Sequence, residues 1–140
     1  MNVDTHAHYA PHRMRDSHVS GRASFPNVEL MHEEDTYKPG SAGGALTRPV
    51  NPRLRHPEPR QVWMEEKGID VQFNGGWLDS FGYELPPYKG HAWSRFLEEH
   101  QIAASNGKDN LRALGSVTLQ DVEKAALLLE GLVGEGLPAL

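Results

Sequence analysis

The alternation of strand-like and helix-like segments in the second half of the chain constrains the fold most strongly. Residues 69–73, Ile-Asp-Val-Gln-Phe, alternate between apolar and polar with period two. Residues 111–117 form a second apolar run of strand length. Helical patterns precede, separate and follow these two runs. Strands that alternate with helices are typical of right-handed βαβ units on a parallel sheet, so the sequence predicts an α/β fold.

Three helices are expected around these strands. The first covers residues 57–67, and Gly68 follows it where a left-handed residue ends many helices. The second covers about residues 88–104, and the third follows Asp121, a residue suited to N-capping. The positions predicted to face the core are Val62, Trp63 and Met64 in the first helix, Trp93, Phe96, Leu97, His100 and Ala104 in the second, and Val122, Ala125, Ala126, Leu129, Leu132 and Val133 in the third.

The first part of the chain has a different character. Residues 2–8 predict a short first strand, whereas residues 9–56 show no sustained period and are rich in Pro, Gly, Ser, His and charged residues. We therefore expect an irregular insertion over residues 9–56, with residues 38–44 as its clearest flexible stretch. Residues 57–140 are then expected to follow in the order α-β-α-β-α.

Composition excludes several kinds of site and partner. Fourteen basic and nineteen acidic residues give a net charge of −5, which speaks against a nucleic-acid binder. The absence of cysteine excludes disulfides, thiolate nucleophiles and Cys-based metal sites, so a transition metal would need His and carboxylate ligands. No apolar run has the roughly 18 residues of a membrane span, and residues 1–6 do not resemble a secretory signal. We expect a cytoplasmic protein without a membrane partner.

The most informative motif is the pair His6 and His8. Side chains at positions i and i+2 of a strand project from the same face, so the two imidazoles can converge on one metal ion. The pair would stand at the carboxyl end of the first strand, where parallel α/β folds place their active sites. The alternative is a His-x-His pair in a loop that binds nothing.

The motif and its surroundings resemble a known family. Residues 3–11, Val-Asp-Thr-His-Ala-His-Tyr-Ala-Pro, are similar to the first-strand metal motif of the amidohydrolase superfamily. The closer resemblance is to the amidohydrolase-related branch that includes aminocarboxymuconate semialdehyde decarboxylase and the resorcylate-type decarboxylases. Residues 60–72 look like that branch's first helix and second strand, residues 111–120 like its third strand, and residues 123–139 like the next helix. Residues 13–56 match poorly.

This resemblance implies a fold and a chemistry. The fold would be the N-terminal part, about three βα units, of a metal-dependent (β/α)₈ TIM barrel. His6 and His8 would hold a divalent metal, either zinc or manganese. The substrate would be a small unsaturated or aromatic carboxylic acid, and the reaction its decarboxylation or hydrolysis. Arg48 lies near the position of the family's substrate-carboxylate arginine, although Arg53 and Arg55 are equally arguable and a solvated loop arginine is the alternative.

The resemblance also implies missing parts. The family's later ligands, further His residues and an Asp from later strands, have no counterpart before Leu140. A (β/α)₈ barrel takes about 250 residues. We therefore expect an incomplete chain, inactive alone and with unidentified catalytic residues, that forms a homodimer or combines with a complementing chain.

Two alternatives remain open. One is a non-catalytic α/β module that pairs its open strand edge with a second chain. The other is a small metal-binding protein that uses His6, His8, His12 and His18. Among the other histidines, we interpret His32 as part of a solvated acidic run, His56 as a helix cap, His91 as a surface residue and His100 as half-buried.

Overall fold

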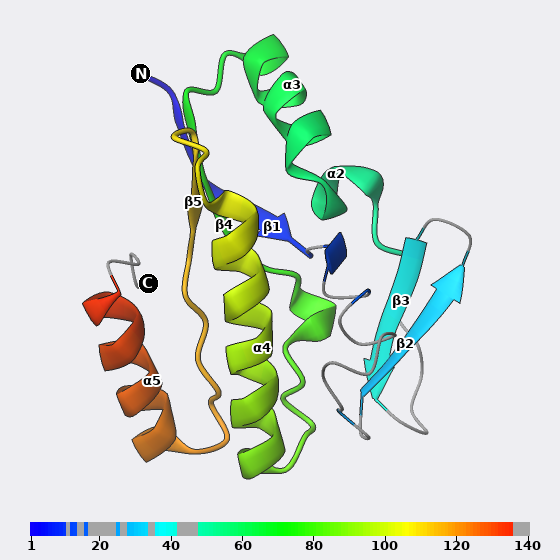
Figure 1. Cartoon of the computed structure of the whole chain (residues 1–140), viewed down its shortest axis with the longest axis vertical. Coiled ribbons are helices and arrows are strands. Elements are labelled where there is room, and N and C mark those ends of the chain that lie inside the picture. The colour runs from blue at the N-terminus through cyan, green and yellow to red at the C-terminus, as the bar shows by residue number, and fades with distance from the viewer. Residues whose placement is uncertain are drawn as a thin grey trace.

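The structure is a computed structural model that describes residues 1–10, 12, 13, 16, 25, 28–33, 36–41 and 48–135. These residues form a mixed α/β fold with a three-stranded parallel sheet and a separate two-stranded antiparallel sheet (Figure 1). The predicted α/β class and the parallel pairing are therefore confirmed.

The parallel sheet has the strand order β1-β4-β5. β1 spans Val3–Tyr9, β4 spans Val71–Gly76 and β5 spans Leu111–Ala113. The β1–β4 register shifts between Asp4 and Ala7, so that His8 pairs with Gly75. The strands therefore follow one another across the sheet in chain order, with their carboxyl ends at one edge.

Helices connect and follow the parallel strands. α3, Pro57–Lys67, lies between β1 and β4 in sequence, and α4, Pro87–Ser105, lies between β4 and β5. α5, Val122–Gly134, follows β5. The short helix α2, Pro52–Arg55, precedes α3, and the 3-10 helix η1, Leu78–Ser80, follows β4. Among the described residues, no helix is both long and apolar enough to cross a membrane.

The bounds and the C-terminal end of α3 agree with the sequence prediction, but its buried side does not. Gly68 adopts φ +65°, and the Ile69 N–H donates to the Met64 carbonyl at 2.9 Å, as in a Schellman motif. Arg60 and Met64 are buried, whereas Val62 is 57% exposed. The helix thus buries the charged side chain of Arg60, and a pattern of apolar residues does not predict such a position.

The two predicted parallel strands are displaced or shortened. β4 begins two residues later than expected, and Gly75 and Gly76 are its last residues rather than the turn after it. β5 ends at Ala113 instead of Val117. The changed ends of β4 and β5 both lie at the carboxyl edge of the sheet.

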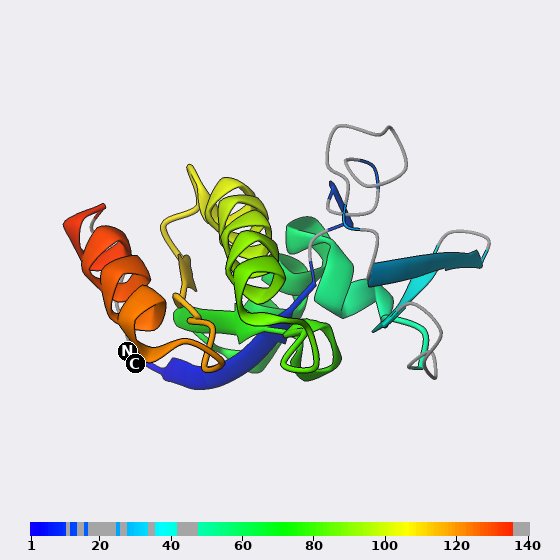
Figure 2. The same ribbon diagram turned by 90° about the horizontal axis from the view of Figure 1, so that it is seen from below.

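The region expected to be irregular contains regular structure. β2, Val28–Glu33, and β3, Thr36–Ser41, form an antiparallel pair in which Leu30 lies opposite Pro39. Both strands of a two-stranded ribbon are edge strands, so Pro39 can stand where its missing N–H faces no third strand. The hairpin and α5 lie at opposite ends of the molecule (Figures 1 and 2). The prediction for residues 9–56 was wrong over this segment and over α2.

The main core also draws on residues 9–56. The cluster of buried apolar side chains consists of Ala10, Val50, Leu85, Trp93, Phe96 and Leu97, with Phe25, Leu54 and Trp77 packed against it. The core-facing residues predicted on α4 are thus confirmed for Trp93, Phe96 and Leu97. The insertion contributes to the core rather than lying outside it.

The predicted core face of α5 is only partly correct. Leu132 is buried as expected, together with Leu128. Val122 and Val133 are instead 80% and 55% exposed. Asp121 does cap this helix, because its side chain accepts the Lys124 N–H at 3.0 Å.

Candidate functional site

The two motif histidines lie side by side at the end of β1. The centroids of the His6 and His8 rings are 5.1 Å apart, and the rings are nearly perpendicular. A tetrahedral ion with two imidazole ligands at 2.0–2.1 Å would hold their ring centres roughly 5 Å apart. The two rings therefore lie close together, at a separation compatible with two ligands of one ion.

The ring orientation of His8 suits a metal ligand. Its Nδ1 lies 3.0 Å from the carbonyl oxygen of Gly76 in the neighbouring strand. A carbonyl can only accept, so Nδ1 carries the proton, and the Nε2 of the neutral ring keeps a lone pair. Metal-bound histidines are commonly fixed in this way by a second hydrogen bond.

The histidine pair opens into a cavity of about 170 Å³. Gly75 and Gly76 of β4 line it, as do Leu114 to Ser116 after β5 and Phe81 after η1. The cavity therefore lies at the carboxyl edge of the parallel sheet, where active sites of such folds lie. Among the described residues, no third His, Asp or Glu joins the pair in a group able to hold a metal ion.

A network of polar side chains, buried except for the half-buried Asp4, supports the backbone of both histidines. Asp4 accepts the His6 backbone N–H at 3.1 Å and the Gln72 side-chain amide at 2.7 Å. The Gln72 carbonyl oxygen accepts from Arg60 at 2.7 Å, and Arg60 also donates to the His8 carbonyl at 2.5 Å. Helix α3 thus holds both β1 and β4 through one guanidinium group.

Arg60 is the centre of this network, and the sequence analysis did not single it out. Its side chain is buried, and it also donates to Asn74 at 2.6 Å. Burial lowers the pKa of Arg60 to about 10, and Tyr9 and Asp4 oppose this, so the group stays charged at neutral pH. A usable signal existed: polar residues at positions 72 and 74 of an otherwise apolar strand indicate a polar partner behind the sheet.

Arg48 is linked to the histidine site by Trp77, whose ring contacts both Arg48 and His8. Its guanidinium carbon is 4.8 Å from the centre of the Trp77 ring, and that ring makes an edge contact with the His8 ring at 6.0 Å. Its Nε is 3.8 Å from the Asp79 carboxylate. Arg53 is exposed and Arg55 is buried. Of the three arginines considered from the sequence, Arg48 is placed with its side chain against a ring that contacts His8.

Glu98 is a second buried group that the sequence prediction missed. Its Oε1 accepts from the Ser116 N–H at 2.6 Å and from the Ser116 hydroxyl at 2.7 Å, which ties α4 to the cavity wall. Its Oε2 is buried with no hydrogen-bond partner among the described residues. Burial raises the pKa of Glu98, and the bonds from Ser116 and the charge of Arg95 oppose that rise.

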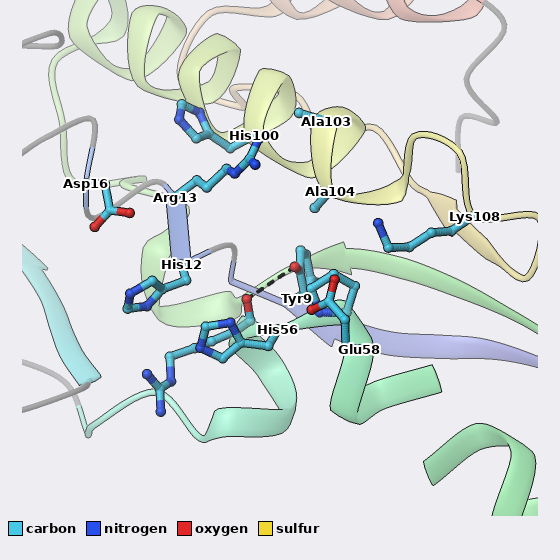
Figure 3. A pocket seen from close by; sticks show the side chains of 12 residues that line it. Tyr9, His12, Arg13, Asp16, His56, Glu58, His100, Ala103, Ala104 and Lys108 are labelled. Atoms are coloured by element: carbon cyan, nitrogen blue, oxygen red, sulfur yellow. Dashed lines mark hydrogen bonds between the residues drawn. The ribbon is translucent and has the colours of Figure 1, made fainter. Parts of the chain in front are cut away.

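Among the described residues, no other histidine joins the pair in a group able to hold a metal ion. His12 packs against His56 with ring centroids 4.8 Å apart, in a different cavity shown in Figure 3. His56 is the N-cap residue of α3 but makes no side-chain capping bond. His100 is half-buried as expected, and His91 is half-buried instead of on the surface. His18 and the side chain of His32 lie outside the described residues.

Comparison with models of known protein families finds no match for this chain, and comparison with curated proteins finds no similar sequence.

Proposed function

We propose that the chain forms the metal-binding start of an amidohydrolase-related (β/α)₈ enzyme. The observation that carries this proposal is the adjacent His6 and His8 rings at the carboxyl edge of the parallel sheet, with His8 oriented by Gly76. The strand order and the intervening helices are compatible with the first three βα units of a barrel. Further ligands and strands would complete the site.

The proposed reaction is decarboxylation or hydrolysis of a small unsaturated or aromatic carboxylic acid. His6 and His8 would hold a divalent metal, zinc or manganese. When bound, such an ion supplies Lewis-acid chemistry and lowers the pKa of a bound water toward about 7. Arg48 would bind the substrate carboxylate, and its contact with Trp77 would hold the guanidinium near the histidines.

Metal titration of the purified chain tests the proposal. We expect calorimetry to detect one zinc ion per chain, and His6→Ala or His8→Ala to weaken its binding at least tenfold. His91→Ala on α4 is the matched control and should bind zinc like the parent. If the double variant of His6 and His8 binds zinc as tightly as the parent, the histidine pair is not a metal site.

A second candidate function is an interaction module without catalysis. Within the described part of the chain, β1 and β5 each pair with a strand on one side only. Val122, Leu127 and Val133 expose apolar side chains on α5. Unpaired parallel edges beside apolar surface favour association with further βα structure. On this reading, Val122→Glu combined with Val133→Glu should reduce association in sedimentation while zinc titration shows no bound ion.

A further inference from the structure

A second cavity, of about 400 Å³, lies near the other side of β1 (Figure 3). Tyr9 lines it, and none of its lining residues also lines the cavity beside His8, so the two cavities are separate. The start of α3 forms one wall, and Ala103 and Ala104 near the end of α4 form the other. Its volume falls within the range of about 300–1,000 Å³ that is usual for small-molecule sites.

The charges around this cavity favour an anion. Arg13 and Lys108 line it and reach into the space below α4 from different sides (Figure 3), and buried Arg55 lies in its wall. Only Asp16 and Glu58 oppose them among its lining residues in the described part of the chain. The positive end of the α3 dipole also points here, because the N-cap residue His56 lines the cavity. This local excess of cations contrasts with the net charge of −5 of the chain.

The neutral groups of the cavity suit the body of an organic ligand. The His12 and His56 rings form an aromatic wall, tilted by 36° at 4.8 Å. His100 lies across the cavity from them (Figure 3), and its Nδ1 lies 2.8 Å from the Phe96 carbonyl oxygen. Burial raises the pKa of Tyr9 well above its ordinary value, so its hydroxyl stays neutral and donates to the Arg55 carbonyl at 3.2 Å. Tyr9 therefore adds no negative charge to the site.

We propose that this cavity binds a small organic anion. A carboxylate or phosphate group would lie between Arg13 and Lys108, and the body of the ligand would rest against the His12 and His56 rings and the alanines of α4. This site uses neither His6 nor His8, so it can be tested independently of the proposed metal chemistry.

Titrations of the metal-free, ¹⁵N-labelled chain with benzoate and with phenyl phosphate test this site. We expect saturable shifts in the amide signals of His56, Ala104 and Lys108 with at least one probe, and the tighter probe identifies the preferred anionic group. Arg13→Glu and Lys108→Glu should each weaken binding at least tenfold. Lys67→Glu changes the net charge equally on an exposed residue outside the cavity and should change binding less than twofold.

Three results would overturn the proposal. These are shifts that fail to saturate with either probe, equal weakening by Lys67→Glu and Lys108→Glu, and loss of binding in the double variant of His6 and His8. The last would place the anion at the histidine pair instead. Because Lys108 and Arg13 are not buried, a thermal melt of each variant should match the parent and exclude unfolding as the cause of lost binding.

Discussion

Gly76 contacts both His8 and the cavity wall formed by Phe81. Its carbonyl accepts from His8, and its α-carbon faces the ring of Phe81 in the cavity wall. A β-carbon at this position would lie 2.8 Å from Phe81 Cε1 and 3.0 Å from Gln101 Nε2. The close approach of these side chains to the backbone therefore requires glycine here.

Gly76→Ala should accordingly destabilise the fold, and Gly75→Ala should not. The added methyl group at position 76 forces Phe81 or Gln101 to move, and overpacking of this kind costs about 1–3 kcal/mol. At position 75 the nearest atom is the Ala7 carbonyl oxygen at 3.9 Å, an ordinary contact, so we expect a change within about 0.5 kcal/mol. Urea unfolding of both variants measures the difference. Equal stabilities would show that the wall around Gly76 yields without cost.

The candidate site was predictable where it depends on local pattern. The spacing of His6 and His8 places both rings on one face, because the strand period is fixed by the backbone. The support from Arg60, Gln72 and Asp4 joins three elements that are distant in sequence, and a shift in the β1–β4 register decides which residues meet. No pattern within one segment contains that information.

Helix ends show how local chemistry determines the bounds of an element. α3 stops at Gly68 because a residue at φ +65° lets two N–H groups turn back to the last carbonyls of the helix. Gly131 lies inside α5 with an ordinary φ, and a β-carbon added there would meet no heavy atom within 4 Å, so glycine has no such role at that position. Glycine is therefore favourable for stability at position 68 and unfavourable at position 131.

We expect opposite effects on stability from alanine at these two positions. Gly68→Ala places a β-carbon in the left-handed region and should cost about 1 kcal/mol. Gly131→Ala restricts the unfolded chain and improves helix propensity, which should stabilise by about 0.4–1 kcal/mol. Thermal melts of the two variants at one pH measure both shifts. A melting temperature that falls for Gly131→Ala would contradict the helical, open environment assigned to that residue.

The sequence prediction missed β3 and the exposed side of α5 because both depend on tertiary contacts. β3 contains Pro39 and Gly40, residues that ordinarily mark loops, and only its pairing with β2 makes it a strand. The exposed side of α5 was mistaken for core because Val122 and Val133 are apolar, although only Leu128 and Leu132 face buried surroundings. Hydropathy indicates which surfaces could be buried, and tertiary packing decides which of them are.

The stability of the whole molecule depends on pH through Glu98, which packs α4 against the segment after β5. It is buried and it bonds Ser116, so α4 cannot separate from the segment after β5 without breaking this contact. Its pKa in the folded chain lies above the ordinary value of 4.5, chiefly through burial. The folded state therefore holds this proton to a higher pH than the unfolded state does.

This difference gives a pH dependence with a definite sign. Below about pH 4.5 the carboxyl is protonated in both states, and its contribution to stability is complete. As pH rises, the unfolded chain releases the proton first, so the contribution is lost until the folded carboxyl has also ionised. Glu98→Gln keeps an uncharged acceptor for Ser116 and removes the titration, so its unfolding free energy relative to the parent should increase from about pH 4 to pH 8.

Urea unfolding of the parent and Glu98→Gln across this range measures the effect, at about 1.4 kcal/mol for each unit by which the two pKa values differ. Glu99→Gln, at the exposed neighbouring position, controls for the loss of one negative charge. If the difference between Glu98→Gln and the parent stays constant from pH 4 to pH 8, the carboxyl of Glu98 ionises equally in both states and is not buried as described. If the difference in unfolding free energy from the parent grows with pH for Glu98→Gln but not for Glu99→Gln, the proton held by the buried Glu98 carboxyl accounts for this pH dependence.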